Sequence, residues 1–440
     1  MITKKLCTVC SVVLSVILIF AGTAYGQIQY ALTLERLGIL YSPGTGGRPY
    51  SMGGAYTAVC DDAFALLYNP AGLAQVKRKE LSFGFHHTRN DASSEYLGFP
   101  TSMTSSTTSL GHVAIVYPYP TYRGSLVLGF GVFRTGGSDI ELMTKDVIDT
   151  NNRTENIYTQ SGSVYQYHVG IGADVSPMVS LGVGLVIWDQ SLDFVDNVVS
   201  EGNDSIAYWA DDVKLDLDGI SVNFGMLVRI NEHVRAGLAV STPTWLSYGG
   251  DAITSYEGDY KTGTYEGWTT DPEYSLIDEE YTLPMTFRGG IAVAVEPVLI
   301  SADAAFIPFS QTKREGLRII DEFDSSGGHA LDDVWNFSIG AEVALPWYPI
   351  RLRGGYAYTP LILSTAEELT RIVDDFPETT IADFEVERER HRFTFGAGAL
   401  IDRVLTLDIG VAIGGYERDT GELLQKREIL EVVASGAYRF

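Results

Sequence analysis

Side chains that commonly carry enzyme chemistry occur in this chain but form no catalytic pattern. His86 and His87 are adjacent in a segment with strand-like alternation, so their rings point to opposite faces and cannot share a metal. The sequence has neither a Gly-x-Ser-x-Gly nor a His-Glu-x-x-His motif. The stretch GTGGRP at 44–49 lacks the Lys-Ser/Thr of a phosphate-binding loop. We therefore predict that the protein is not an enzyme and that it has no metal site and no cofactor.

The start of the chain has the pattern of an export signal. Lys4 and Lys5 precede an apolar run from Leu6 to Phe20, and small residues lead to a cleavage site after Gly26. Residues 1–26 are therefore predicted to be a signal peptide. After cleavage Cys60 is the single cysteine left, so no internal disulfide can form, and we expect a buried small side chain rather than a redox group.

The formal net charge of −25 argues against a nucleic-acid partner, because phosphates would repel the chain. The acidic residues concentrate in 191–213 and 251–280, which we interpret as polar, solvated loops. Their role in binding divalent cations stays open, since the Asp-x-Asp-x-Asp-Gly pattern of a calcium loop is missing.

Apolar residues recur at every second position from about residue 79 onward, which is the period of a β-strand. In 178–188 and 335–345 one face is wholly apolar, while the other carries Gly, Ser, Asn and isolated charges. The 46 glycines and the abundant aromatic residues also fit an all-β protein.

About fourteen such segments can be counted, most of ten residues or more, the length with which a tilted strand crosses a bilayer. Their connections alternate between short and long, as in barrels with short periplasmic turns and long external loops. The predicted long connections are 89–109, 135–161, 191–213, 244–279, 310–332, 362–388 and 417–427. We therefore predict an all-β fold, a transmembrane antiparallel β-barrel of about 14 strands spanning residues 79–440.

The last strand ends in Tyr438 and Phe440, two aromatic residues on one face. This ending resembles the C-terminal signature of bacterial outer-membrane barrels, which implies recognition by the barrel assembly machinery. A barrel of fourteen strands encloses more space than its own side chains can fill. We therefore expect another segment in the lumen.

Residues 27–78 are the candidate for that segment, a hatch or plug. The run from Met52 to Leu73 resembles the N-terminal hatch of the FadL family of outer-membrane transporters, which are fourteen-stranded barrels with an Asn-Pro-Ala motif in the plug. The resemblance implies a hatch or gate role for Met52, Gly53, Gly54, Asp61, Asp62, Asn69, Pro70, Ala71 and Gly72. Asp61 or Asp62 is expected to cap a short helix over 63–67, which the Asn69-Pro70 step would end.

The FadL resemblance implies uptake of hydrophobic small molecules, such as long-chain fatty acids, across the bacterial outer membrane. Strand phase places several charged residues inside the barrel: Arg229, Arg235, Asp303, Glu342, Arg351, Arg353, Arg392 and Asp408. An arginine there could hold a carboxylate head group, although paired charges between wall and hatch are the simpler interpretation. The predicted ligand-binding residues are Phe133, Trp188, Arg229, Arg351 and Arg392.

A second function stays open at this point. Barrels of the PorV type are FadL-like yet carry cargo for a protein secretion system, and long acidic loops would suit a docked partner protein. Predicted partners are therefore outer-membrane lipid and lipopolysaccharide, a hydrophobic ligand, the barrel assembly machinery and, in the alternative, secretion proteins.

Overall fold

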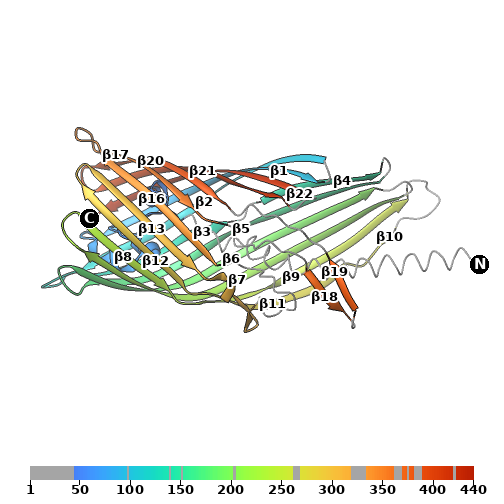
Figure 1. Cartoon of the computed structure of the whole chain (residues 1–440), viewed down its shortest axis with the longest axis horizontal. Helices are drawn as coiled ribbons and strands as arrows, with labels where there is room; N and C mark the ends of the chain where they lie inside the picture. The colour runs from blue at the N-terminus through green and yellow to red at the C-terminus, as the bar shows by residue number, and fades with distance from the viewer. Residues whose placement is uncertain are drawn as a thin grey trace, which may run out of the picture.

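The alternating segments form antiparallel strands that close into one barrel (Figure 1). The computed structural model describes residues 44–96, 99–137, 140–149, 152–201, 205–260, 268–318, 333–360, 369–373, 376–380, 389–419 and 423–440. The predicted signal peptide and residues 27–43 of the predicted hatch lie outside these ranges. Closure is made by β1 (Glu80–Tyr96) and β22 (Leu423–Arg439), which pair in continuous register from one end to the other.

The described strands make up fourteen barrel strands, some of them interrupted by a break in the chain's pairing, which confirms the predicted fold class. Between β1 and β22 they are β2 (Phe99–Tyr119), β3 with β4 (Leu126–Gly137, Ile140–Asp149), β5 (Asn152–Asp174), β6 (Val179–Glu201), β7 (Ser205–Arg229), β8 with β9 (Val234–Ser241, Thr244–Tyr260), β11 with β12 (Glu273–Leu283, Thr286–Val295), β13 (Val298–Ile307), β16 (Val334–Ala344), β17 (Ile350–Tyr358), β20 (His391–Ile401) and β21 (Leu405–Asp419). Short pieces are η2 (Phe309–Gln311), β10 (Trp268–Thr269), β14 (Lys313–Arg314), β15 (Leu317–Arg318), β18 (Leu369–Val373) and β19 (Phe376–Thr380).

The outer face of the barrel is apolar. On β6, Leu181 and Ile187 are 46% and 44% exposed, and Phe395 on β20 is 58% exposed. Residues between these positions point inward, because side chains alternate along a strand. A continuous exposed apolar face costs free energy in water but not against lipid. This surface is therefore the one expected of a transmembrane barrel.

Several predicted long loops are strands instead. Residues 89–96 and 99–109 form the paired ends of β1 and β2, and residues 191–201 and 205–213 form the paired ends of β6 and β7. Both segments continue the ladder of hydrogen bonds past the apolar belt. Their polar composition hid this, because a strand with water on its outer face loses the apolar alternation that identifies strands in a sequence.

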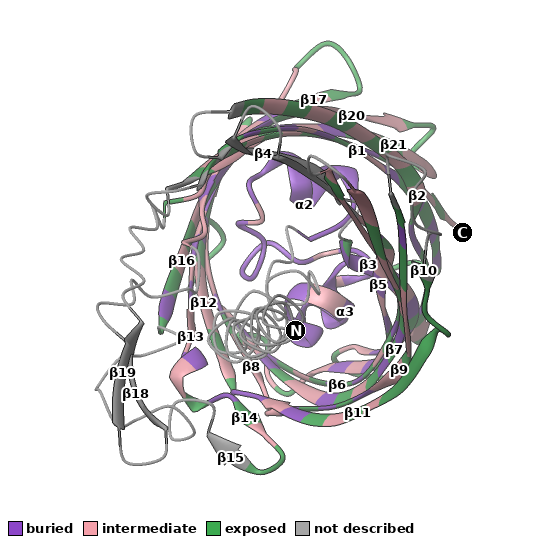
Figure 2. Ribbon diagram, turned by 90° about the vertical axis from the view of Figure 1, so that its right-hand side faces the viewer, coloured by how far each residue is buried: buried purple, intermediate pink, exposed green. Residues whose placement is uncertain are grey.

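Residues 44–78 lie inside the barrel, as the view along its axis shows (Figure 2). The segment contains α2 (Gly47–Ser51), α3 (Ala65–Tyr68) and the 3-10 helix η1 (Pro70–Gln75). In the described part of the chain, no helix has the length and apolarity to cross a membrane. We call residues 44–78 the plug.

Candidate functional site: the plug and the lumen

The plug is almost wholly buried, with Tyr50, Met52, Tyr56 and Leu73 at 0% exposure. Close approach to the wall depends on glycines in the strands. A Cβ at Gly182 would lie 2.3 Å from the backbone of Pro70 and Ala71, and a Cβ at Gly340 would lie 2.4 Å from the Met52 carbonyl oxygen. Such contacts are closer than carbon atoms tolerate, so small residues on the inner wall let the plug's backbone lie directly against the strands.

Gly53 and Gly54 turn the chain after α2. Their φ angles are +66° and +80°, a region that L side chains rarely adopt. A Cβ at Gly53 would also lie 2.7 Å from the carbonyl oxygen of Tyr356 on β17. The Gly-Gly pair is thus required for this turn and for its contact with the wall.

Asn69 connects the plug to β7. Its Nδ2 donates to the carbonyl oxygens of Thr57 and Met226, at 2.9 and 3.1 Å. Its Oδ1 accepts from the backbone N–H of Ala71 at 3.1 Å, at the start of η1. Extended backbone at Asn69 separates α3 from η1, in agreement with the expected helix end before Pro70.

Asp62 stabilises the turn that leads into α3. Its Oδ1 accepts from the backbone N–H of Phe64 at 3.0 Å, and its Oδ2 accepts from the Tyr56 hydroxyl at 2.6 Å. The helix begins at Ala65, two residues later than expected. Burial, together with the charges of Glu80 and Asp61, raises the pKa of Asp62 to about 7. Asp62 is therefore a buried carboxyl group that titrates near neutral pH.

A buried ionic network joins the plug to β16, β17 and β21. Arg48 of α2 contacts Asp61 within the plug and donates from Nε to Glu342 of β16 at 3.0 Å. Glu342 also accepts from Arg353 at 2.7 Å, and Arg353 donates to Asp408 at 2.6 Å. Removing one member would leave the others as uncompensated buried charges, which is strongly unfavourable. The network is a strong attachment of the plug.

Two further contacts hold the plug elsewhere. Asp303 of β13 accepts from the backbone N–H groups of Tyr56 and Thr57, at 2.9 and 2.8 Å. The Arg392 guanidinium of β20 lies 5.0 Å from the centre of the Tyr50 ring. The plug is therefore attached to at least five strands around the wall.

Cys60 lies buried within the plug. Its thiol donates to the carbonyl oxygen of Tyr56 at 2.9 Å, and burial raises its pKa. Since the nucleophilic form is the thiolate, this position suits a packing role.

The lumen beyond the plug is apolar on one side. A cluster of inward side chains comes from β6, β7, β9, β11, η2 and β16, and we call it the lumen cluster. Its buried members are Leu192, Leu215, Leu217, Leu246, Tyr248, Tyr281, Leu283, Phe309 and Val334. Leu192 lies ten residues along β6 from Gly182, so it is roughly 30 Å along the strand from the plug contact, toward the long-strand end.

Aromatic residues continue this apolar surface. Trp188 packs against the cluster, and the rings of Trp209 and Tyr256 are stacked 5.3 Å apart farther along β7 and β9. The opposite wall differs: His86 on β1, Glu431 on β22 and Arg392 on β20 are buried and polar. Inside the barrel, one wall is therefore apolar and the other is charged.

The residues predicted to bind ligand do not form one site. Phe133 is fully buried against the plug, 6.2 Å from the Phe64 ring, and Trp188 borders the lumen cluster. Arg229 pairs with Asp174 at 2.8 Å beside a short turn. Arg351 and Arg392 lie near the plug, in or beside the ionic contacts just described. Their role in ligand binding stays a prediction.

Sequence reasoning missed Arg48 and most of the lumen cluster. Arg48 is one isolated cation in a segment of small and apolar residues, and such a residue needs buried acids around it. Leu192 was assigned to a polar loop because acids surround it. Among the described residues, no group of three or more His, Cys, Asp or Glu side chains is placed to hold a metal ion.

Solved structures with this fold include several plugged barrels. A Pseudomonas aeruginosa FadL homologue superposes with a TM-score of 0.59 and 14% identity, covering 91% of this chain and 99% of its own. The Pseudomonas putida toluene transporter TodX gives 0.59 and 16%, with 91% and 100% covered. The Ralstonia pickettii toluene transporter TbuX gives 0.56 and 15%, with 90% and 99% covered. At these identities the similarity establishes the fold.

No curated protein matches the chain in sequence. A family model does match, that of BamG, over residues 4–329. The match spans well over half of the chain, and the protein is thus a member of the BamG family.

Proposed function

We propose that the protein is an outer-membrane transporter that takes up hydrophobic small molecules, such as long-chain fatty acids, through its plugged barrel. The lumen cluster carries this proposal. It places apolar side chains from several strands inside the barrel, between the long-strand end and the plug. Burying apolar surface stabilises such a ligand by about 25 cal/mol per Å². The opposite, charged wall would suit a polar head group.

The fold supports the same function. The structures it resembles include a FadL homologue and two toluene transporters, and toluene is a hydrophobic small molecule. Strands that end in short turns at one side and extend at the other fit a barrel in the outer membrane, with its long side outward.

Leu217→Gln tests the role of the lumen cluster. Leu217 is a member of the cluster and is 1% exposed, so an amide there would place an unsatisfied polar group among the apolar side chains of the cluster. We expect initial uptake of radiolabelled oleate or toluene by a complemented deletion strain to fall about tenfold. Leu276→Gln is the matched control, since Leu276 is 86% exposed on β11, and it should retain uptake. Equal uptake by both variants at equal barrel abundance would exclude the lumen cluster as the ligand path.

A second candidate function follows from the family match. The family's name, BamG, points to an association with the barrel assembly machinery, and we propose this as the alternative role. The same deletion strain separates the two functions, because folding of other outer-membrane barrels can be measured beside uptake. Normal uptake with reduced folding of other barrels favours the assembly role. The PorV-type secretion role rests on the sequence alone and stays a prediction.

A further inference from the structure

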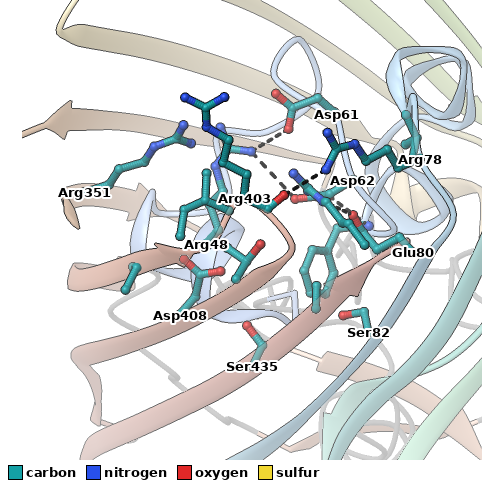
Figure 3. Close-up of a pocket in the computed structure, with 18 of the residues that line it drawn as sticks. Arg48, Asp61, Asp62, Arg78, Glu80, Ser82, Arg351, Arg403, Asp408 and Ser435 are labelled. Carbon is teal, nitrogen blue, oxygen red and sulfur yellow. Dashed lines mark hydrogen bonds and ion pairs between the residues drawn. The ribbon is translucent and has the colours of Figure 1, made fainter. Parts of the chain in front are cut away.

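A charged cavity of about 350 Å³ lies between the plug and the barrel wall at the short-turn end (Figure 3). The plug contributes residues from Arg48 to Arg78, and the wall contributes residues of β1, β17 and the strands from β20 to β22. Its volume falls within the range of roughly 300–1,000 Å³ that is usual for small-molecule sites. It is separate from the lumen cluster, with which it shares no residue.

The cavity collects positive charge in a strongly acidic protein. The whole chain has 31 basic and 56 acidic residues, yet basic side chains outnumber acidic ones around this cavity. The basic lining residues are Arg48, Lys77, Arg78, Arg351, Arg353, Arg403 and Arg439, and the acidic ones are Asp61, Asp62, Glu80 and Asp408. A reversal of this kind makes the cavity attractive to anions.

The inner cations of the cavity are already paired. Arg48 and Arg353 share Glu342, as described above, and Arg439 donates to Glu80 at 2.7 Å. Arg351 contacts Glu342 from one Nη at 3.3 Å, while its side chain is 43% exposed. Arg351 therefore keeps donors that face the cavity.

Two outer cations of the cavity, Arg78 and Arg403, make no ion pair with an acidic residue in the described part of the chain, while the charge of Lys77 acts on Asp174. Lys77 donates to the carbonyl oxygen of Ala74, and Arg78 donates to that of Arg403 at 3.0 Å. The guanidinium of Arg403 makes no ion pair with a described residue. In Figure 3 the guanidinium groups of Arg351 and Arg403 project on the same side of the cavity.

We propose that this cavity binds a multivalent oxyanion of the phosphate type, which enters from the short-turn side. The positive charge of Arg78 and Arg403, together with the partly exposed Arg351, favours a dianion over a monoanion, and guanidinium groups bind phosphate oxygens with paired hydrogen bonds. The volume exceeds that of inorganic phosphate, so a small phosphate monoester also fits. The proposal is independent of hydrophobic transport, since none of its residues belongs to the lumen cluster.

Titration calorimetry on the intact barrel in detergent tests this proposal. Inorganic phosphate and glycerol phosphate are the probes, and octanoate is the monoanion for comparison, all at low ionic strength because salt screens such contacts. We expect saturable binding of at least one phosphate probe, and binding about tenfold weaker in the Arg351→Gln, Arg403→Gln double variant. Binding of inorganic phosphate alone would identify the free ion as the ligand, and binding of glycerol phosphate would identify the ester.

Lys79→Gln is the matched control. Lys79 is exposed beside the cavity but does not line it, and its Nζ lies 5.1 Å from the Tyr117 ring centre. The control should bind phosphate as the wild type does. Slower gel mobility after boiling verifies that each barrel is folded. No saturable phosphate binding, equal binding of octanoate, or an equal loss in Lys79→Gln would overturn the proposal.

Discussion

At the scale of single residues, the plug depends on polar groups that are buried and matched to one another. Asn69, Asp303 and Glu342 each hold plug atoms that burial would otherwise leave without partners. The sequence indicated that Asp303 and Glu342 face inward, because strand phase alone decides that. It did not indicate their partners, since these lie more than 200 residues away and depend on how the plug sits in the barrel.

Asp62 gives the plug a pH dependence. Its pKa in the seated plug is about 7, above its ordinary value of 3.8, so the seated plug favours the protonated form. This stabilisation is complete below about pH 4 and is lost as pH rises through 7. We expect plug amides to exchange hydrogen faster at pH 8 than at pH 5, after correction for the intrinsic exchange rate. The free energy of opening the plug should be lower at pH 8, by an amount on the order of 2–4 kcal/mol.

Asp62→Asn should remove most of that pH dependence and slow exchange at pH 8, because an amide does not ionise. Asp271→Asn is the control, since Asp271 is exposed between β10 and β11, outside the plug, and should leave the pH dependence in place. Corrected plug exchange that does not change between pH 5 and 8 in the wild type would contradict this assignment.

At the scale of elements, the strands were predicted better than their ends. All fourteen barrel strands were expected from period-2 alternation, because a strand with lipid on one face needs an apolar residue at every second position. The extensions of β6 and β7 were not, because that requirement stops where the bilayer stops. The plug helices are only four to six residues long, and their placement comes from wall contacts rather than from helical periodicity.

The step between α3 and η1 should control how firmly the plug is seated. Asn69→Ala removes two hydrogen bonds to carbonyl oxygens and the cap of η1, which should cost about 1–3 kcal/mol. We expect larger single-channel conductance fluctuations and faster protease cleavage within residues 44–78, with the barrel still heat-modifiable. Gln75→Ala, which loses a 3.2 Å hydrogen bond to Ser180 near the end of η1, is the control and should change both readouts less.

At the scale of the whole molecule, the barrel closes where the two ends of its sheet meet. The backbone N–H of Phe440 donates to the carbonyl oxygen of Lys79 at 3.0 Å, and its ring stacks on Tyr438 with 5.8 Å between centres. The ordering of the chain end is therefore coupled to closure of the sheet. An open edge in the bilayer would leave backbone groups unsatisfied, so failure at this seam should prevent insertion.

Phe440→Ala is consequently expected to lower the yield of assembled barrel several-fold, while exposed aromatic residues elsewhere on the outer wall should tolerate the same change. Phe395→Ala on β20 is the matched control, because Phe395 is 58% exposed and Phe440 is 57% exposed. The measurement is the heat-modifiable fraction in outer-membrane preparations. An equal fall in both variants would mean that general contact with lipid, rather than the chain end, limits assembly. A fall in Phe440→Ala alone would assign the terminal aromatic pair a specific role in closing the barrel.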